Sequence, residues 1–229
     1  MTTKALIIPA AGSGTRLGEQ IPKSFIKLSG CPILAHTLRR FLPLKGLVQI
    51  IIATSEDFLS EARQILKTEA PESIKTSAIA GGKERQHSIG NALNELLEAD
   101  LVIIHDAVRP FVKLNHIDAC CKAASETGAA LLGVPAKNTI KEIDDEHFIR
   151  RTPDRESLWQ AQTPQVFKKQ LIVEAYRQAM NENYIGTDDA SLVEKLGQKV
   201  KMIKGDPSNF KITYPVDLQL ARLLIEEQE

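Results

Sequence analysis

Short, almost continuous apolar runs recur along the chain, and they constrain the fold more than any other feature. Four of these runs are residues 5–8, 48–53, 101–104 and 129–134, and a weaker fifth covers 76–80. Strands buried on both faces have this pattern, so the runs predict a sheet with helices on both faces. Amphipathic stretches separate the runs. This alternation predicts a doubly wound, mostly parallel, Rossmann-like α/β sheet.

Two of the stretches between the runs have the spacing of a helix. One carries apolar residues at 89, 92, 93, 96 and 97, and the other covers 169–181. Asp188 and Asp189 suit the start of a further helix that ends near Gly197, because acidic residues stabilise a helix N-terminus. Ligands of such sheets bind beyond the carboxyl ends of the strands. A functional site is therefore expected in the segments that follow the apolar runs.

One segment, residues 138–157, breaks the alternation. Two polar runs, 138–143 and 148–151, flank the acidic stretch 144–147, which predicts a β-hairpin. The segment is too polar to be core, so it is expected to be a lid or an arm that contacts another subunit. No linker divides the rest of the chain, and residues 1–229 are expected to form a single domain.

The overall charge excludes some classes of partner. The chain has 29 Lys and Arg and 29 Asp and Glu residues, so no general field attracts nucleic acid or an anionic membrane. The start lacks the pattern of a signal or transit peptide, and no apolar stretch approaches the roughly 18 residues of a membrane span. Three cysteines in no disulfide pattern indicate a reducing compartment. A cytoplasmic protein is expected, or a stromal one for a mature plastid form.

A glycine-rich loop, PAAGSGTRLGEQIPK, follows the first apolar run at residues 9–23. It matches neither a Walker A loop nor a dinucleotide fingerprint, because Leu17 stands where both need a glycine. Its glycines still allow backbone N–H groups to face a phosphate. Arg16 adds a guanidinium fork and Lys23 a point charge. The loop therefore predicts phosphate binding, although a plain strand-to-helix turn with two solvated charges fits its spacing too.

Five blocks of sequence together resemble one family. The loop with Pro22-Lys23 is similar to the signature of sugar-phosphate nucleotidyltransferases. The other four blocks are GGKERQHS at 81–88, HDAVRP at 105–110, DRESLWQAQTPQ at 154–165 and FKIT at 210–213. They narrow the resemblance to the 2-C-methyl-D-erythritol 4-phosphate cytidylyltransferases of the non-mevalonate isoprenoid pathway. The resemblance extends over nearly the whole chain and implies transfer of CMP from CTP to a polyol phosphate, with release of pyrophosphate.

The resemblance also implies roles for individual residues. Catalytic roles fall to Arg16, Lys23, Arg155 and Lys211. The implied nucleotide contacts are Pro9, Ala10, Ala11, Gly12, Ser13, Gly14, Gly81, Gly82, Lys83, Ser88, Asp106 and Ala107. The implied contacts to the second substrate are Asp106, Arg109, Thr139, Arg155, Thr163, Thr187 and Lys211.

A metal ion and a dimer are implied as well. Mg²⁺ would be held mainly by the CTP phosphates, with Asp106 as a candidate ligand. From its position after an apolar run, Asp106 could equally bind a ribose or substrate hydroxyl. The family's hairpin crosses to a partner subunit, so a homodimer is expected in which Arg155 serves the neighbouring site. His105 is expected to be a buried, hydrogen-bonded residue and not a metal ligand.

Three alternatives compete with this interpretation. Ribitol 5-phosphate cytidylyltransferases share the chemistry, but they tend to have Ala-Gly-Gly in the first loop and to lack the Leu-Trp found here at 158–159. A non-catalytic nucleotide-binding regulator could share the fold. A dinucleotide-dependent oxidoreductase fails on the missing third glycine. Lys83 stands where some relatives have an acidic residue, which leaves the choice of base open if that side chain reads it.

Overall fold

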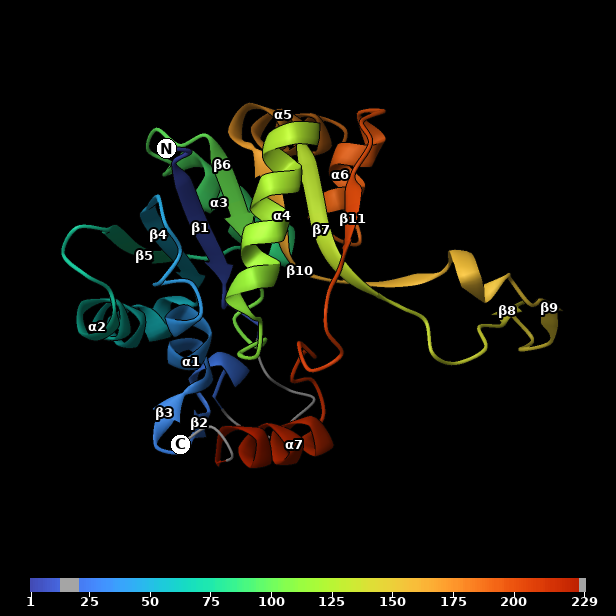
Figure 1. Cartoon of the computed structure of the whole chain (residues 1–229), viewed down its shortest axis with the longest axis horizontal. Coiled ribbons are helices and arrows are strands. Elements are labelled where there is room, and N and C mark those ends of the chain that lie inside the picture. The colour runs from blue at the N-terminus through green and yellow to red at the C-terminus, as the bar shows by residue number, and fades with distance from the viewer. Residues whose placement is uncertain (13–20, 227–229) are drawn as a thin grey trace.

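The computed structural model describes residues 1–12 and 21–226, and a seven-stranded sheet forms its centre (Figure 1). Strand β10 runs antiparallel to both of its neighbours, β6 and β7, and every other neighbouring pair is parallel. In spatial order the strands are β11 (Lys201–Lys204), β7 (Ala129–Pro135), β10 (Trp159–Lys168), β6 (Leu101–Ile104), β1 (Lys4–Pro9), β4 (Leu47–Thr54) and β5 (Lys75–Ala80). The predicted apolar runs are thus confirmed as β1, β4, β5, β6 and β7.

Helices cover both faces of the sheet, as predicted. Alternate residues of β1 face opposite sides: Leu6 and Ile8 belong to one buried cluster, and Ile7 belongs to the other. The first face packs against α1 (Ile33–Arg39), α2 (Leu59–Glu69) and α4 (Leu114–Thr127), and the second against α3 (Arg85–Asn94), α5 (Lys169–Asn181) and α6 (Asp189–Lys195). The doubly wound α/β fold class is therefore confirmed.

The predicted helices differ from the observed ones in one respect. Helix α5 matches the expected bounds, and α6 begins at Asp189 with Asp188 as its N-cap. Helix α3 ends at Asn94, so the extension to Leu96 and Leu97 is wrong. Leu97 is 51% exposed, and its backbone N–H is held by the side chain of Gln49. No helix among residues 1–12 and 21–226 is long and apolar enough to cross a membrane.

A small third cluster lies beyond the carboxyl ends of the strands. Helix α7 (Pro215–Glu226) packs there against the hairpin of β2 (Lys27–Leu28) and β3 (Cys31–Pro32). Figure 1 shows α7 below the sheet, on the side toward which β1 points. The chain enters α7 through residues 206–214, and Ile212 N–H donates to the carbonyl of Val108. The last segment of the chain is thus tied to the end of β6.

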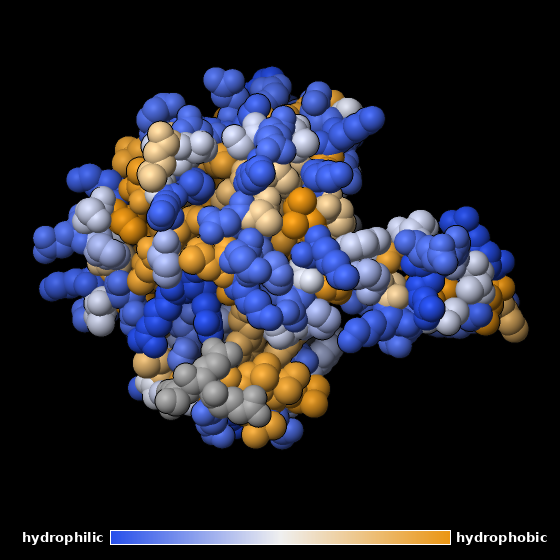
Figure 2. All heavy atoms as spheres, in the orientation of Figure 1, coloured by the Kyte–Doolittle hydropathy of each residue, from blue (hydrophilic) through white to orange (hydrophobic). Residues whose placement is uncertain are grey.

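The expected hairpin is a two-stranded arm between β7 and β10. Its strands, β8 (Glu142–Ile143) and β9 (Ile149–Arg151), are shorter than the polar runs suggested. The arm projects away from the body, with exposed apolar residues near its end (Figure 2). Phe148 is 67% exposed and Ile149 is 60% exposed. No residue of the arm belongs to the buried core clusters that the described residues form.

Candidate active site

A cavity of about 450 Å³ lies at the carboxyl ends of β1 and β6 and beside the start of α3. This is where the fold class predicts a ligand site. Five stretches of the sequence meet there, around residues 9–12, 23–24, 82–88, 106–108 and 211–212. The described residues that line the cavity are Pro9, Ala10, Ala11, Gly12, Lys23, Ser24, Gly82, Lys83, Glu84, Arg85, Ser88, Asp106, Ala107, Val108, Lys211 and Ile212.

The turn between β5 and α3 packs so closely against the end of β1 and the start of α3 that there is no room for a side chain at Gly81. A Cβ on Gly81 would lie 2.7 Å from Ala11 Cβ and 2.8 Å from Ser88 Oγ. The buried Ser88 hydroxyl accepts from the N–H of Gly82 at 3.0 Å and donates to the carbonyl of Glu84 at 3.1 Å. Glycine is therefore needed at 81 so that backbone groups can line the cavity beside the end of β1.

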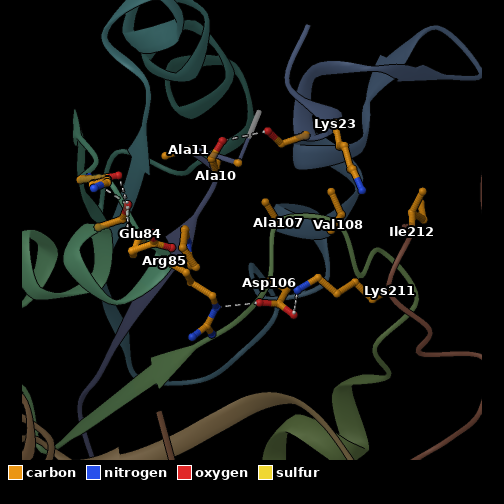
Figure 3. Close-up of a pocket in the computed structure, with 16 residues that line it drawn as sticks. Ala10, Ala11, Lys23, Glu84, Arg85, Asp106, Ala107, Val108, Lys211 and Ile212 are labelled. Carbon is orange, nitrogen blue, oxygen red and sulfur yellow. Dashed lines mark hydrogen bonds and ion pairs between the residues drawn. The ribbon is translucent and has the colours of Figure 1, made fainter. Parts of the chain in front are cut away.

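Three cations surround the carboxylate of Asp106, which directly follows β6 and His105. Arg85 Nε lies 3.2 Å from Asp106 Oδ1, and Lys211 Nζ lies 3.2 Å from Oδ2 (Figure 3). Arg109 Nε contacts the same Oδ2 at 3.2 Å and sends its Nη1 to the carbonyl of Asn209. The Asp106 side chain is only 9% exposed. Asp106 thus brings together Arg85 of α3 and Lys211 of the loop before α7.

The charges of these neighbours determine the protonation of Asp106. Burial alone would raise the pKa of its carboxyl, but the charges of Arg85, Lys211 and Arg109 outweigh burial and hold this pKa well below its usual range. Burial has the opposite effect on Arg85 and would lower the pKa of its guanidinium. The charges of Asp189 and Asp106 outweigh burial, so the pKa of Arg85 lies above its usual range. Asp106 and Arg85 therefore both remain ionised at neutral pH.

A buried hydrogen-bond chain fixes the backbone of Asp106. His105 Nε2 lies 3.0 Å from the carbonyl of Arg109, which can only accept, so this nitrogen carries the proton. His105 Nδ1 then accepts from the hydroxyl of Thr163, 3.0 Å away. The hydroxyl oxygen of Thr163 in turn accepts from the N–H of Asp106 at 3.0 Å. His105 is fully buried, as the sequence predicted.

Acidification is expected to destabilise the protein through His105. Burial lowers the pKa of this imidazole to about 4, whereas an exposed histidine titrates at about 6.5. Between these values the unfolded chain binds a proton that the folded protein rejects. The free energy of unfolding should therefore fall as the pH drops below about 6.5, by about 2 kcal/mol at about pH 5, and the fall should end near the folded pKa.

Urea unfolding at about pH 7 and pH 5 would measure this fall. The matched variant is His105→Asn, which keeps a polar side chain but has no group that titrates in this range. Its free energy of unfolding should fall by clearly less than that of the wild type. An equal fall in both proteins would show that another group causes the acid sensitivity.

Lys23 and Lys211 approach the cavity from opposite ends of the chain. Lys23 begins a short 3-10 helix, Lys23–Phe25, after the rigid Pro22, and its Nζ donates to the carbonyl of Thr213 at 2.9 Å. Thr213 follows Lys211 by two residues, and its own N–H is held by Asp217 of α7 at 2.8 Å. The segment that carries Lys211 thus also orients Lys23.

The cavity has an excess of positive charge although the whole chain is neutral. Among the described lining residues, Lys23, Lys83, Arg85 and Lys211 are cationic, and only Glu84 and Asp106 are acidic. This local excess of positive charge suits a polyanion such as a triphosphate.

The structure brings together many of the residues expected in the site, but not all. Pro9 to Gly12, Lys23, Gly82, Lys83, Ser88, Asp106, Ala107 and Lys211 line the cavity, and Gly81 and Arg109 contact lining residues. Ser13, Gly14 and Arg16 lie outside the described residues. Thr163 is buried behind Asp106, and Thr187 lies in the loop before α6. Thr139 and Arg155 lie along the arm, where Arg155 Nη1 donates to the carbonyl of Lys137.

Several residues of the site were not expected from the sequence. Arg85 lies inside the block GGKERQHS, but a single arginine at the start of a helix does not indicate two acidic partners. Asp189 was interpreted only as a helix-capping acid, but it accepts both Nη groups of Arg85, at 3.0 and 2.8 Å. Asn209 donates to the carbonyl of Thr163 at 2.8 Å and so fixes the loop that leads to Lys211. No pattern in the sequence pointed to these contacts.

The donor atoms allow only a limited protein contribution to a metal site. Within residues 1–12 and 21–226, no group of three His, Cys, Asp or Glu side chains could hold an ion. Asp106 and Glu84 are the carboxylates of the described lining, and Asp106 already contacts three cations, which leave about one of its roughly four lone-pair positions. One such carboxylate fits Mg²⁺ only where phosphates supply most of the ligands.

Comparison with known proteins agrees with this geometry. A family model described as 2-C-methyl-D-erythritol 4-phosphate cytidylyltransferase matches residues 4–227. A protein of that name from Solibacter usitatus is 41% identical over an alignment of 235 positions, which covers 98% of this chain and 96% of the relative. Another from Clostridioides difficile is 43% identical over 229 residues, which cover 98% of this chain and 94% of the relative.

Solved structures agree as well. The 4-diphosphocytidyl-2C-methyl-D-erythritol synthase of Anaerococcus prevotii superposes with a TM-score of 0.88 at 29% identity, covering 98% of this chain and 96% of the other. The 2-C-methyl-D-erythritol 4-phosphate cytidylyltransferase of Thermus thermophilus gives 0.79 at 31% identity, covering 99% and 100%.

Proposed function

The chain belongs to the 2-C-methyl-D-erythritol 4-phosphate cytidylyltransferase family, and on that premise we propose which of its residues carry the reaction. The chain is a nucleotidyltransferase of isoprenoid precursor synthesis that transfers CMP from CTP to 2-C-methyl-D-erythritol 4-phosphate. The observation that carries the assignment of residues is the convergence of four family-like blocks on one cationic cavity, from residues 9–12, 82–88, 106–108 and 211–212.

The reaction is an in-line displacement at the α-phosphorus of CTP. A phosphate oxygen of the erythritol phosphate forms a bond to this phosphorus, and the bond to the β-phosphate bridging oxygen breaks, so pyrophosphate leaves with that electron pair. Negative charge grows on the phosphoryl oxygens and on the leaving group. The protein therefore contributes mainly by positioning the two substrates and stabilising charge.

The nucleotide is assigned to the β1, β5 and β6 side of the cavity. Backbone groups of Ala10 to Gly12 and of Gly81 to Lys83 face the base and phosphates, and Ser88 fixes the second turn. Lys23 stabilises the charge that develops on the phosphates, together with Arg16 of the same loop. This assignment is supported by the position of the Lys23 ammonium against Thr213 and by the missing room for side chains at Gly81.

The phosphate of the second substrate is assigned to Lys211, Arg109, Thr187 and Arg155, with Thr139 as a further hydroxyl residue. Asp106 holds Lys211 and Arg109 in place for this phosphate, which is supported by the two 3.2 Å contacts at its Oδ2. Thr163 acts through the backbone N–H of Asp106, because its hydroxyl already bonds to Asp106 and His105.

Mg²⁺ is proposed to enter with CTP. When bound, it neutralises part of the triphosphate charge and assists departure of pyrophosphate. Asp106 is the protein carboxylate that would help to hold it, with the CTP phosphates supplying most of the ligands. Lys23 and Lys211 then supply the remaining positive charge from the protein.

A homodimer with a shared site is proposed for this chain. Arg155 and Thr139 lie on the arm and are absent from the described lining of their own cavity. The exposed Phe148 and Ile149 give the arm an apolar surface that a partner subunit would cover. An arm that crosses to a second copy would bring Arg155 to the neighbouring cavity.

A cytoplasmic location is also proposed, supported by the state of the cysteines. Cys31, Cys120 and Cys121 are all free thiols. Burial raises the pKa of the Cys120 and Cys121 thiols, so neither is a nucleophile. Free buried thiols are usual in a reducing compartment.

Pyrophosphate release tests the function. The protein is incubated with Mg²⁺ and CTP, and either 2-C-methyl-D-erythritol 4-phosphate or ribitol 5-phosphate is added. Release is expected with the erythritol phosphate and not when UTP replaces CTP. Preference for ribitol phosphate would keep the chemistry but change the substrate. Tight binding of CTP without turnover would instead indicate a nucleotide-binding regulator.

A further inference from the structure

The loop between α5 and α6, residues 182–188, is held by a glutamine that the reaction scheme does not use. Gln86, the second residue of α3, donates through Nε2 to the carbonyl of Tyr184 at 2.9 Å. Its Oε1 accepts from the N–H of Gly186, also at 2.9 Å. One side chain therefore satisfies both a backbone carbonyl and a backbone N–H of this loop.

Arg85, the neighbour of Gln86, holds the end of the same loop. Its two Nη groups bind the carboxylate of Asp189, which is 1% exposed and also accepts from the Tyr176 hydroxyl at 2.6 Å. From β10, Gln165 contacts Asp188 Oδ2 at 2.7 Å and accepts from Ala190 N–H at 2.8 Å. The backbone on each side of Thr187 is thus fixed by side chains that are distant in sequence.

The position of Arg85 and Gln86 links two parts of the proposed site. They follow the turn at Gly81 to Lys83, which is assigned to the nucleotide. Arg85 also contacts Asp106, which holds Lys211. The close packing of this loop requires a glycine at 186, because a Cβ there would lie 2.5 Å from Ser191 Oγ and 2.6 Å from Leu192 Cδ2.

We infer that Arg85 and Gln86 form a clamp that positions the Thr187 loop for the phosphate of the second substrate. Gln86 is a positioning residue, since it acts on the substrate only through the loop backbone. The inference rests on the proposed function, which assigns Thr187 to that phosphate. If the contacts only tied α3 to α6 structurally, their loss would lower the fraction of folded enzyme. The apparent kcat would then fall, and the KM values for both substrates would stay unchanged.

The test uses Gln86→Met, which retains the length of the side chain and removes both hydrogen bonds. Two hydrogen bonds of ordinary strength correspond to about a tenfold change in an equilibrium constant. The KM for 2-C-methyl-D-erythritol 4-phosphate should therefore rise about tenfold, and the KM for CTP should change less than about twofold. Gln86→Glu, which retains the acceptor for Gly186, should lie between the two proteins.

The matched control is Gln178→Met on the neighbouring helix α5. Gln178 is half-buried, and among the described contacts its side chain donates only to Glu182, at 2.8 Å. This variant should keep both wild-type KM values. Equal changes in both KM values of Gln86→Met, or no change in either, would overturn the inference.

Hydrogen exchange gives a second readout that needs no turnover. The N–H of Gly186 donates to Gln86, so exchange in a peptide covering 184–187 should become faster in Gln86→Met and remain unchanged in Gln178→Met. If the wild type does not use the erythritol phosphate, the proposed function is wrong. Hydrogen exchange still tests whether Gln86 holds the loop, because it needs no substrate. Unchanged exchange in Gln86→Met would overturn the clamp whatever the substrate.

Discussion

Replacing Lys23 with alanine is expected to lower kcat by about 10²–10³-fold, the usual cost of removing one preorganised charge contact from a transition state. The Lys23 ammonium lines the cavity and is oriented by the Thr213 carbonyl at 2.9 Å. Because the charge grows as the pyrophosphate leaves, kcat should fall more than the affinity for CTP.

Steady-state pyrophosphate release measures this effect, and Lys27→Ala provides the matched control. Lys27 lies in β2, four positions later, and its side chain is exposed. It should retain wild-type turnover. If Lys23→Ala worked at full speed, the assignment of Lys23 to the transition state would be wrong.

Replacing Asp106 with asparagine is expected to damage both stability and activity. The amide removes the charge that Arg85, Arg109 and Lys211 share, and Arg109 is only 11% exposed. Leaving a buried charge without its partner costs about 3–5 kcal/mol, and solvent near Lys211 and Arg85 favours the lower end, about 3 kcal/mol. Lys211 would also lose its orientation, so kcat should fall at least about 10²-fold.

Urea unfolding near pH 7 and a turnover assay measure the two effects. Because the folded-state pKa of Asp106 is depressed, its stabilisation is present above the unfolded value of about 3.9 and is lost only as the pH falls through the folded value. The difference between variant and wild type should therefore be constant across the neutral range. Asp118→Asn, at an exposed position of α4, should match the wild type. An Asp106→Asn variant with wild-type stability and turnover would refute the role of this cluster.

The sequence predicted the parallel part of the sheet because those strands are buried on both faces and are nearly pure apolar runs. Strand β10 escaped prediction because its first half carries polar side chains that bond to distant loops. Gln162 donates to the carbonyl of Asp206, and Thr163 contacts Asp106 and His105. Residues of this kind follow no regular hydrophobic pattern along the strand, because contacts with distant segments determine which residue is needed at each position. The edge strand β11 was missed as well, since its two apolar residues, Met202 and Ile203, stand between lysines and form no apolar run.

The candidate site was predictable only in part, for a related reason. The glycine turns and the residues after β1 and β6 carry local patterns, and these residues do line the cavity. The contacts that organise them join residues far apart in the chain, such as Asp106 with Lys211 and Arg85 with Asp189. An ion pair of this kind depends on where two segments meet in space. Each partner alone looks like an ordinary surface charge.

The place at which the arm leaves the sheet bears on how this protein could evolve. Strands β7 and β10 are adjacent and antiparallel, and they pair as far as Pro135 opposite Trp159. A pair of this kind needs a connection of only about two to five residues. The arm is thus an insertion at a point where a tight turn would suffice. The part of the arm between Thr139 and Arg155 can therefore change in length and sequence without shifting the register of any strand of the seven-stranded sheet.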